Sequence, residues 1–175
     1  MDLQRADYAT IIKFGTLDDF QKKIEMESQS LGGIIDTTDA NEISLLQKAL
    51  ISRKFDIVKY LLNESAKVNI ISKDGFNELH YLAANINFDD AIQVARLLIN
   101  HGVDLNHVDK KYGNSALLSI CLEILKRQTK EGMEFIEEII EQNADVDIVN
   151  KSGISVRTLL DERGTDRIRL LLKEK

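Results

Sequence analysis

A helix-start pattern that recurs four times limits the possible folds of this chain more than any other feature. Its polar first residue recurs at intervals of 33, 38 and 40 residues, at Ser44, Asn77, Ser115 and Ser155. After Asn77, the apolar residues Leu79, Leu82 and Ala83 have the i, i+3, i+4 spacing of one helix face. Self-similarity at such a period indicates a stack of one repeated structural unit.

A second apolar segment follows each of the first three copies. These segments carry pairs of Leu, Ile or Val and span residues 57–62, 94–99 and 135–140. From the start of the first helix to the start of the second, the separation grows from 13 to 17 to 20 residues. The additional residues therefore lie mainly between paired helices, as insertions at 85–90 and 123–132. A period that varies only in its loops is still a structural repeat.

The chain resembles ankyrin-repeat proteins in its period, which is about 33 residues in that family, and in the motif Asn77-Glu78-Leu79-His80. The resemblance covers residues 36 to 175 and implies an all-α fold. This fold is an ankyrin-repeat solenoid, in which helix-turn-helix repeats stack through turn connections. We expect four to five repeats, including the caps. The proline of the family motif is replaced in every copy, by Leu45, Glu78, Ala116 and Val156.

The pattern predicts one domain over residues 1–175. Residues 1–36 are expected to be a degenerate N-terminal capping repeat, with two short helices and many charged residues. Its apolar face comprises Tyr8, Ile11, Ile12 and Phe14. The remaining units are three full repeats and a C-terminal capping repeat, at 37–69, 70–106, 107–147 and 148–175.

Nine or ten helices and almost no sheet are expected. The helices of the last four units should pair as 44–53 with 56–64, 77–84 with 90–101, 115–129 with 132–143, and 155–162 with 165–173. The residues of 123–132 should lengthen the third inner helix by about two turns. Gly75, Gly113 and Gly153 allow a positive φ in the turns, whereas Glu42 in the first turn predicts a looser turn.

Structural roles explain the residues that could in principle act in catalysis or bind a metal. His80 lies at the histidine of the family motif, which implies a hydrogen bond between neighbouring turns. His101 and His107 do not have a zinc spacing, and Cys121 occupies a small, buried position of an inner helix. Glutamates between 131 and 141 fit the solvent face of an amphipathic helix. We therefore predict no catalytic residue, no metal site and no cofactor.

Composition narrows the choice of partners. The net charge is −6, and basic residues form no stripe with aromatic residues, which disfavours binding to nucleic acid. The sequence contains no run of eighteen apolar residues, so it predicts no membrane span. The N-terminus lacks the pattern of a signal peptide, and the single cysteine gives no disulfide framework. We expect a cytoplasmic protein.

The resemblance implies a non-enzymatic module that binds a protein partner, as a monomer or in a 1:1 heterocomplex. In ankyrin-repeat proteins the turn tips and the exposed face of the inner helices usually hold the partner. These places correspond to Asn41, Ile43, Ile51, Asp74, Phe76, Asn85, Lys110, Lys111, Tyr112, Asn114, Glu123 and Ile154. Phe76, with Tyr112 and Ile43, is the predicted anchor, because apolar residues at exposed positions favour binding. Alternatively, the apolar members pack against one another, or the two insertions bind the partner.

Two other functions remain open. An immunity or inhibitor protein would neutralise a cognate toxin, and that toxin would be basic because residues 73–150 have a net charge of −7. An enzyme or enzyme subunit would use the acidic patches at 89–90 and 131–141.

Overall fold

The recurring polar residues are N-caps that start one helix in each repeat. The computed structural model describes residues 1–27, 31–142 and 144–175. Within them, the side-chain oxygens of Ser44, Asn77, Ser115 and Ser155 each accept a hydrogen bond from the backbone N–H three residues later. This bond satisfies one of the amides that a helix start leaves unpaired. The helices that they start, called the inner helices here, are α4 (Leu45–Ile51), α6 (Glu78–Ala83), α8 (Ala116–Arg127) and α10 (Val156–Arg163).

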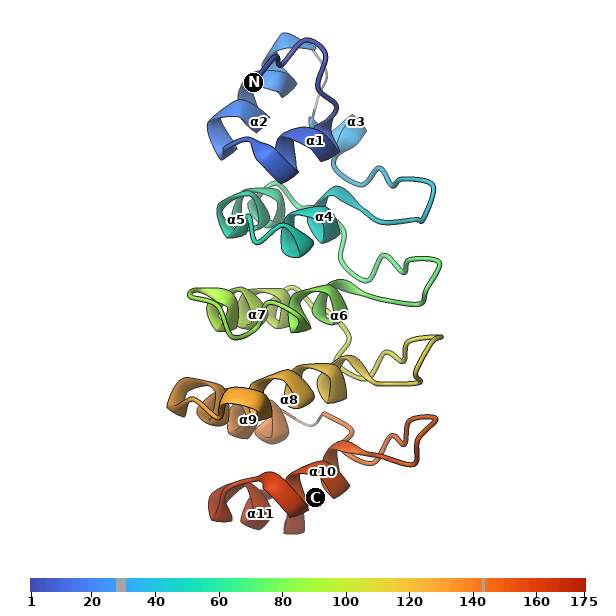
Figure 1. Cartoon of the computed structure of the whole chain (residues 1–175), viewed down its shortest axis with the longest axis vertical. Coiled ribbons are helices and arrows are strands. Elements are labelled where there is room, and N and C mark those ends of the chain that lie inside the picture. The colour runs from blue at the N-terminus through green and yellow to red at the C-terminus, as the bar shows by residue number, and fades with distance from the viewer. Residues whose placement is uncertain (28–30, 143) are drawn as a thin grey trace.

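Each inner helix is followed by an antiparallel partner, which we call an outer helix. The outer helices are α5 (Phe55–Asn63), α7 (Ala91–Asn100), α9 (Lys130–Glu141) and α11 (Asp166–Lys173). Figure 1 shows the pairs stacked in one column, with the turns projecting on one side. The predicted all-α solenoid is confirmed, and each helix begins and ends within two residues of its predicted position. Residue 143, the predicted end of the range 132–143, lies outside the described residues.

The N-terminal cap contains one helix more than expected. It is built from α1 (Tyr8–Phe14), α2 (Leu17–Met26) and α3 (Leu31–Ile34), which brings the described residues to eleven helices, without any strand. The sequence predicted only two helices in this cap and none over residues 31–34. Burial of Ile34 and Ile35 instead holds one helical turn against the stack. The predicted apolar face of α1 is wrong at Phe14, whose ring points to solvent and is 68% exposed.

A single core runs through the column. Inner helix α6 packs between α4 and α8, and outer helix α7 packs between α5 and α9. Leu79, Leu98 and Ile136 are completely buried within this core. Because each repeat covers only its neighbours, the apolar face of one repeat is buried by the next. The boundaries between repeats remain a prediction.

The first turn has the same conformation as the turn at Gly75. Gly75, Gly113 and Gly153 have φ of 82°, 71° and 78°, as predicted, and Glu42 has φ of 61°. The Glu42 N–H donates to the Asp39 carbonyl at 2.9 Å, just as the Gly75 N–H donates to the Ser72 carbonyl at 2.8 Å. The expected looser first turn is therefore wrong, because Glu42 adopts the left-handed conformation itself.

Neighbouring turn tips are joined by backbone hydrogen bonds. Lys73 N–H donates to the Asn41 carbonyl, Lys110 N–H to the Asp74 carbonyl, and Lys151 N–H to the Tyr112 carbonyl, each at 3.0 Å. We call this series of bonds the tip ladder. It runs along the projecting edge seen at the right of Figure 1. The ladder fixes the position of each tip relative to the next.

The tip ladder predicts unequal effects of two glycine substitutions. A Cβ at Gly75 would lie 2.7 Å from the backbone nitrogen of Lys110, whereas a Cβ at Gly153 would meet nothing within 4 Å. Both residues have positive φ, so each alanine should cost roughly 1–2 kcal/mol for the backbone conformation. Gly75→Ala should cost at least about 1 kcal/mol more, since the clash separates two tips. Urea denaturation of the two variants measures the difference, and equal losses would contradict the role of close approach.

The two insertions lie on the edge opposite the turn tips (Figure 1). Insertion 85–90 is bonded to both neighbouring repeats. Asn85 Nδ2 donates to the Leu50 carbonyl at 3.0 Å, and Asn87 Nδ2 donates to the Glu123 carbonyl at 2.8 Å. Insertion 123–132 extends α8 to 12 residues, against 7 in α4 and 6 in α6, which adds about one and a half turns.

Candidate protein-binding surface

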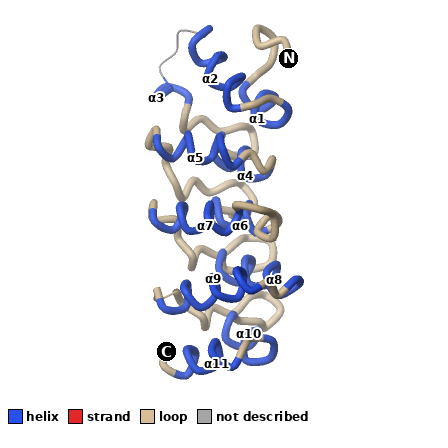
Figure 2. The backbone as a smooth tube through the Cα atoms, turned by 90° about the vertical axis from the view of Figure 1, so that its left-hand side faces the viewer, coloured by secondary structure: helices blue, strands red, loops and turns tan. Residues whose placement is uncertain are grey.

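A shallow groove of about 200 Å³ lies between α6, α8 and the turn that connects their repeats. Figure 2 shows the inner helices α4, α6 and α8 along one side of the column, with the outer helices along the other. Four of the predicted partner-binding residues line this inner groove: Phe76, Tyr112, Asn114 and Glu123. The other lining residues are His80, Ala83, Ala84, Asp109, Ser119 and Leu122.

Phe76 is held in place by two rings of the adjacent helix. It stacks on His80 with a centroid distance of 5.4 Å and an interplanar angle of 16°, and its edge meets Tyr81 at 5.5 Å. The Phe76 side chain is half-buried, so one part contacts these rings while the other faces the groove. A rigid aromatic ring offers apolar contact area at low entropic cost. Tyr112 lines the same groove and is 52% exposed.

His80 forms a neutral wall of the groove. Its Nε2 lies 3.1 Å from the Asn114 carbonyl oxygen, and its Nδ1 lies 2.8 Å from Asn77 Oδ1. Burial lowers the pKa of His80 below its ordinary value. This bond to the next repeat agrees with the structural interpretation of His80. Its second role, stacking on Phe76, was missed, although their i, i+4 spacing is a sequence signal for side-chain contact.

We predict that acid weakens the contribution of His80 to stability. The folded pKa lies below the unfolded value, so the advantage of the neutral ring is complete above about pH 6.5 and is lost as the pH falls through the folded pKa. The difference in unfolding free energy between the wild type and His80→Gln should therefore narrow between about pH 7.5 and pH 5.5. Glutamine keeps an N–H donor and does not titrate. Chemical denaturation at both pH values measures this difference, and a gap that widens on acidification would oppose the prediction.

Asp109 orders the turn that carries Tyr112. Its buried carboxylate accepts hydrogen bonds from the N–H of Tyr112 at 2.6 Å and from the N–H of Asn114 at 2.9 Å. Charged acceptors of this kind make strong hydrogen bonds. Asp109 was not among the predicted site residues. An aspartate in this segment is a turn signal, but the sequence does not show that the turn borders a groove.

The remaining predicted residues lie outside the groove. Asn41, Asp74, Lys110 and Lys111 are exposed at the turn tips, and Ile43 is half-buried in the first turn. Ile51 and Ile154 are 46% and 38% exposed. Asn85 is half-buried, and its amide bonds the preceding repeat.

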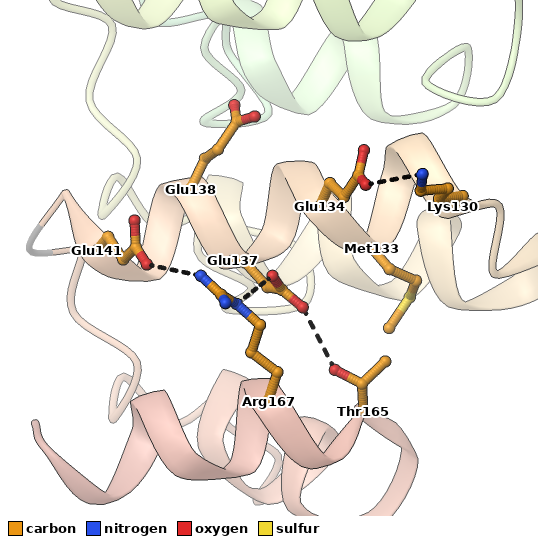
Figure 3. A pocket seen from close by; sticks show the side chains of 8 residues that line it. All are labelled: Lys130, Met133, Glu134, Glu137, Glu138, Glu141, Thr165 and Arg167. Carbon is orange, nitrogen blue, oxygen red and sulfur yellow. Dashed lines mark hydrogen bonds and ion pairs between the residues drawn. The ribbon is translucent and has the colours of Figure 1, made fainter.

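A second cavity, of about 700 Å³, lies between the outer helices α9 and α11 (Figure 3). It is lined by Lys130, Met133, Glu134, Glu137, Glu138, Glu141, Thr165 and Arg167. In this outer cavity, Arg167 reaches from α11 to Glu137 at 2.8 Å and to Glu141 at 3.7 Å, as Figure 3 shows. Glu134 and Glu141 are exposed, as expected, but the side chain of Glu137 is only 17% exposed. Glu137 and Glu141 join α9 to the next repeat through Arg167.

Arg96 makes a similar connection on the other side of α9. Its Nε and Nη2 atoms each donate to Glu138 at 2.8 Å, and this pairing lowers the pKa of the Glu138 carboxyl. Ion pairs thus connect α9 to the outer helix before it and to the one after it.

The described residues offer little chemistry outside these surfaces. Cys121 is fully buried, and desolvation raises the pKa of its thiol to about 12, so the reactive thiolate is disfavoured. Among the described side chains, His, Cys, Asp and Glu form no group of three or more that could hold a metal ion. No described helix has the length and apolar character needed to cross a membrane.

Comparison with known proteins identifies the repeats. A family model described as ankyrin repeats (3 copies) matches residues 20–109 and 46–150. The chain is 29% identical over 109 residues to an ankyrin repeat protein of fowlpox virus (strain NVSL), which covers 62% of this chain and 17% of the viral protein. It is 26% identical over 117 residues to the ankyrin repeat and KH domain-containing protein mask of Drosophila melanogaster, covering 67% of this chain and 3% of the fly protein. Thus the chain spans less than a fifth of either relative, and it belongs to the ankyrin-repeat family.

Proposed function

We propose that the chain binds a segment of a protein partner in the inner groove, with Phe76 and Tyr112 as the apolar anchors. Ankyrin-repeat modules are generally scaffolds for protein–protein interaction, typically without catalytic activity. The observation that supports this binding mode is the fixed position of Phe76, which stacks on His80 beside the exposed Tyr112. Aromatic residues in ordered surroundings contribute much of the affinity in protein interfaces.

Photo-crosslinking tests the location of binding. A displayed library of random peptides is selected against the wild-type chain, and the selected peptide is then incubated with chains that carry benzoylphenylalanine at one position. Crosslinking is expected from position 112, in the groove. Position 170 is the control, because Leu170 is 60% exposed on α11, away from the groove. A peptide that crosslinks only at position 170 would contradict the proposal.

A second candidate is an immunity or inhibitor protein that binds a basic toxin at the outer cavity. The observation in its favour is the lining of that cavity, where four glutamates outnumber the two basic residues, Lys130 and Arg167. A field of one sign attracts a partner of opposite charge and raises its association rate. The glutamates lie on the outer helices and the predicted anchors on the inner side, so the two candidates use different surfaces.

Association kinetics test the second candidate. A basic ribonuclease of known structure is a suitable model partner, because its active surface attracts phosphate. We expect its association rate to fall at least tenfold as salt increases from about 0.05 M to 0.5 M. Substituting glutamine for Glu134 and Glu141 should lower the rate at low salt, whereas the same change at Glu25 and Glu64, which are exposed elsewhere, should have little effect. A rate that responds to neither salt nor substitution would oppose this candidate.

A further inference from the structure

Five segments connect paired helices, from the α1–α2 pair to the α10–α11 pair, on the edge opposite the turn tips. This edge is on the left of Figure 1 and faces the viewer in Figure 2. We call it the connection edge, and we define it as each connection together with the last two residues of the helix before it: residues 13–16, 50–54, 82–90, 126–129 and 162–165. These residues include six basic and three acidic side chains, a net charge of +3 on a chain whose net charge is −6.

Basic side chains join the first three of these segments. Lys54 Nζ donates to the Gly15 carbonyl at 2.7 Å, which connects the second segment to the first. The guanidinium of Arg53 lies 4.4 Å from the centroid of the Phe88 ring, which connects the second segment to the third. The second segment thus holds one cation against each of its neighbours.

The last three segments are joined in the same way. Arg127 Nη1 donates to the Asn87 carbonyl at 3.4 Å, which connects the fourth segment to the third. Arg163 Nη2 donates to the carbonyl of Leu125 at 2.8 Å, next to the start of the fourth segment. The connection edge is therefore one continuous surface, and its positive charges are held in place along the column.

Three large apolar side chains are exposed on the same edge. Phe14 is 68% exposed, Ile51 is 46% exposed and Phe88 is 44% exposed. A cation lies beside each of the two rings, because Lys13 Nζ is 5.1 Å from the centroid of Phe14 and Arg53 lies against Phe88. These residues come together only when the repeats stack, so the sequence showed no stripe of basic and aromatic residues.

This combination of charge and apolar groups fits an anionic lipid surface. Such a surface attracts basic residues through their charge, without a defined spacing. The hydrogen bonds of Lys54, Arg127 and Arg163 to neighbouring carbonyls therefore leave the attraction in place. Exposed aromatic and aliphatic side chains bind at the boundary between the lipid headgroups and the acyl chains. Nucleic acid is less favoured, because proteins bind it largely through hydrogen bonds to phosphate oxygens, which require free donors.

We propose that the connection edge binds the surface of an anionic membrane, with the rings of Phe14 and Phe88 inserted at the level of the headgroups. Because the edge has a net charge of +3 and the whole chain has −6, the remaining residues have a net charge of −9. An anionic bilayer attracts the edge and repels the rest of the chain, so the charge distribution orients the column on the membrane. The turn tips then point away from the lipid.

Vesicle flotation tests the choice of surface. Vesicles of phosphatidylcholine alone are compared with vesicles in which about 30% of the lipid is phosphatidylserine. We expect the chain to bind the anionic vesicles at least about tenfold more tightly at about 0.05 M salt, and to lose this preference at about 0.5 M. Equal binding to both kinds of vesicle, or binding to neither, would overturn the inference. An oligothymidylate that releases the chain from the anionic vesicles would assign the edge to nucleic acid and would also overturn it.

Charge-matched variants test the location. Lys13→Gln combined with Arg53→Gln should weaken binding to the anionic vesicles about tenfold, because each basic residue near the surface adds to the attraction. Lys73→Gln combined with Lys111→Gln is the control. It removes the same charge from exposed residues of the turn tips, on the opposite edge, and should change binding less than about twofold. Equal weakening by the two pairs would overturn the inference.

A third pair of substitutions tests insertion of the rings at constant charge. Phe14→Ala combined with Phe88→Ala should weaken binding to the anionic vesicles about tenfold, because apolar area no longer enters the lipid. Leu170→Ala removes an exposed apolar side chain from α11 and should have little effect. Circular dichroism checks that each variant is folded. Unchanged binding of the double phenylalanine variant would overturn the inference.

Discussion

Replacing Leu79 with alanine is expected to destabilise the chain by about 2–5 kcal/mol. Leu79 is completely buried in α6, between the inner helices of both neighbouring repeats. Alanine would remove apolar contacts and leave a cavity that a packed stack closes only in part. Leu98, equally buried in α7, should show a loss in the same range. Urea denaturation followed by circular dichroism measures both changes.

Leu170→Ala is the matched control for this prediction. It removes the same atoms from a side chain that is 60% exposed, so we expect a loss below about 0.5 kcal/mol. Lys110→Ala at a turn tip should also cost below about 0.5 kcal/mol, because it leaves the backbone of the tip ladder unchanged. Similar losses for all four variants would mean that the register of the buried faces is wrong.

Phe76→Ala is expected to weaken binding of the peptide selected for the inner groove by about 2 kcal/mol or more, which is roughly 30-fold in Kd. The substitution removes the ring that faces the groove but leaves His80 and Tyr81 in place. Because Phe76 is only half-buried, the fold should survive its loss. Calorimetric titration measures the affinity, and the circular dichroism spectrum checks the fold.

Phe88→Ala is the control for the anchor. Phe88 is 44% exposed in insertion 85–90, where the guanidinium of Arg53 lies 4.4 Å from the ring centroid. The same atoms are removed outside the groove, so affinity should change less than about twofold. If Phe88→Ala weakens binding of the peptide and Phe76→Ala does not, then the insertion binds the partner, which is the alternative given above.

The helices were predictable because their signals are local. An N-cap oxygen, a 3.6-residue apolar period and a positive-φ glycine each act within a few residues, so Ser44, Asn77 and Gly75 identify their own elements. Helix α3 and the turn at Glu42 were not predictable in this way. Helix α3 forms where Ile34 and Ile35 are buried against the stack, despite its two glycines. Glu42 has a φ of 61°, which glutamate rarely adopts, in a turn whose Asn41 and Ile43 N–H groups donate to the Asp39 carboxylate.

The binding surface was predictable in position but only partly in composition. The repeat register placed Phe76, Tyr112 and Asn114 on the inner side, and they line one groove. The role of His80 depends on a ring contact within its repeat and a hydrogen bond to the next, and a linear pattern does not encode that geometry. Charge counts along the chain were also incomplete. The counts show that the middle repeats have a net negative charge. They do not show that Glu137 and Glu138 pair with arginines of other repeats.

The tip ladder also provides a set of amide protons that report on individual repeat interfaces. The amide protons of Lys73, Lys110 and Lys151 belong to exposed residues, yet each is bonded to the preceding tip. Solvent reaches such a proton when the two tips separate, so its rate of exchange with deuterium gives the free energy of opening that one interface. The three rates together give a profile of stability along the column. A ligand that spans several tips would slow all three, whereas a ligand confined to the inner groove would act mainly on Lys110 and Lys151, the amides on either side of Tyr112.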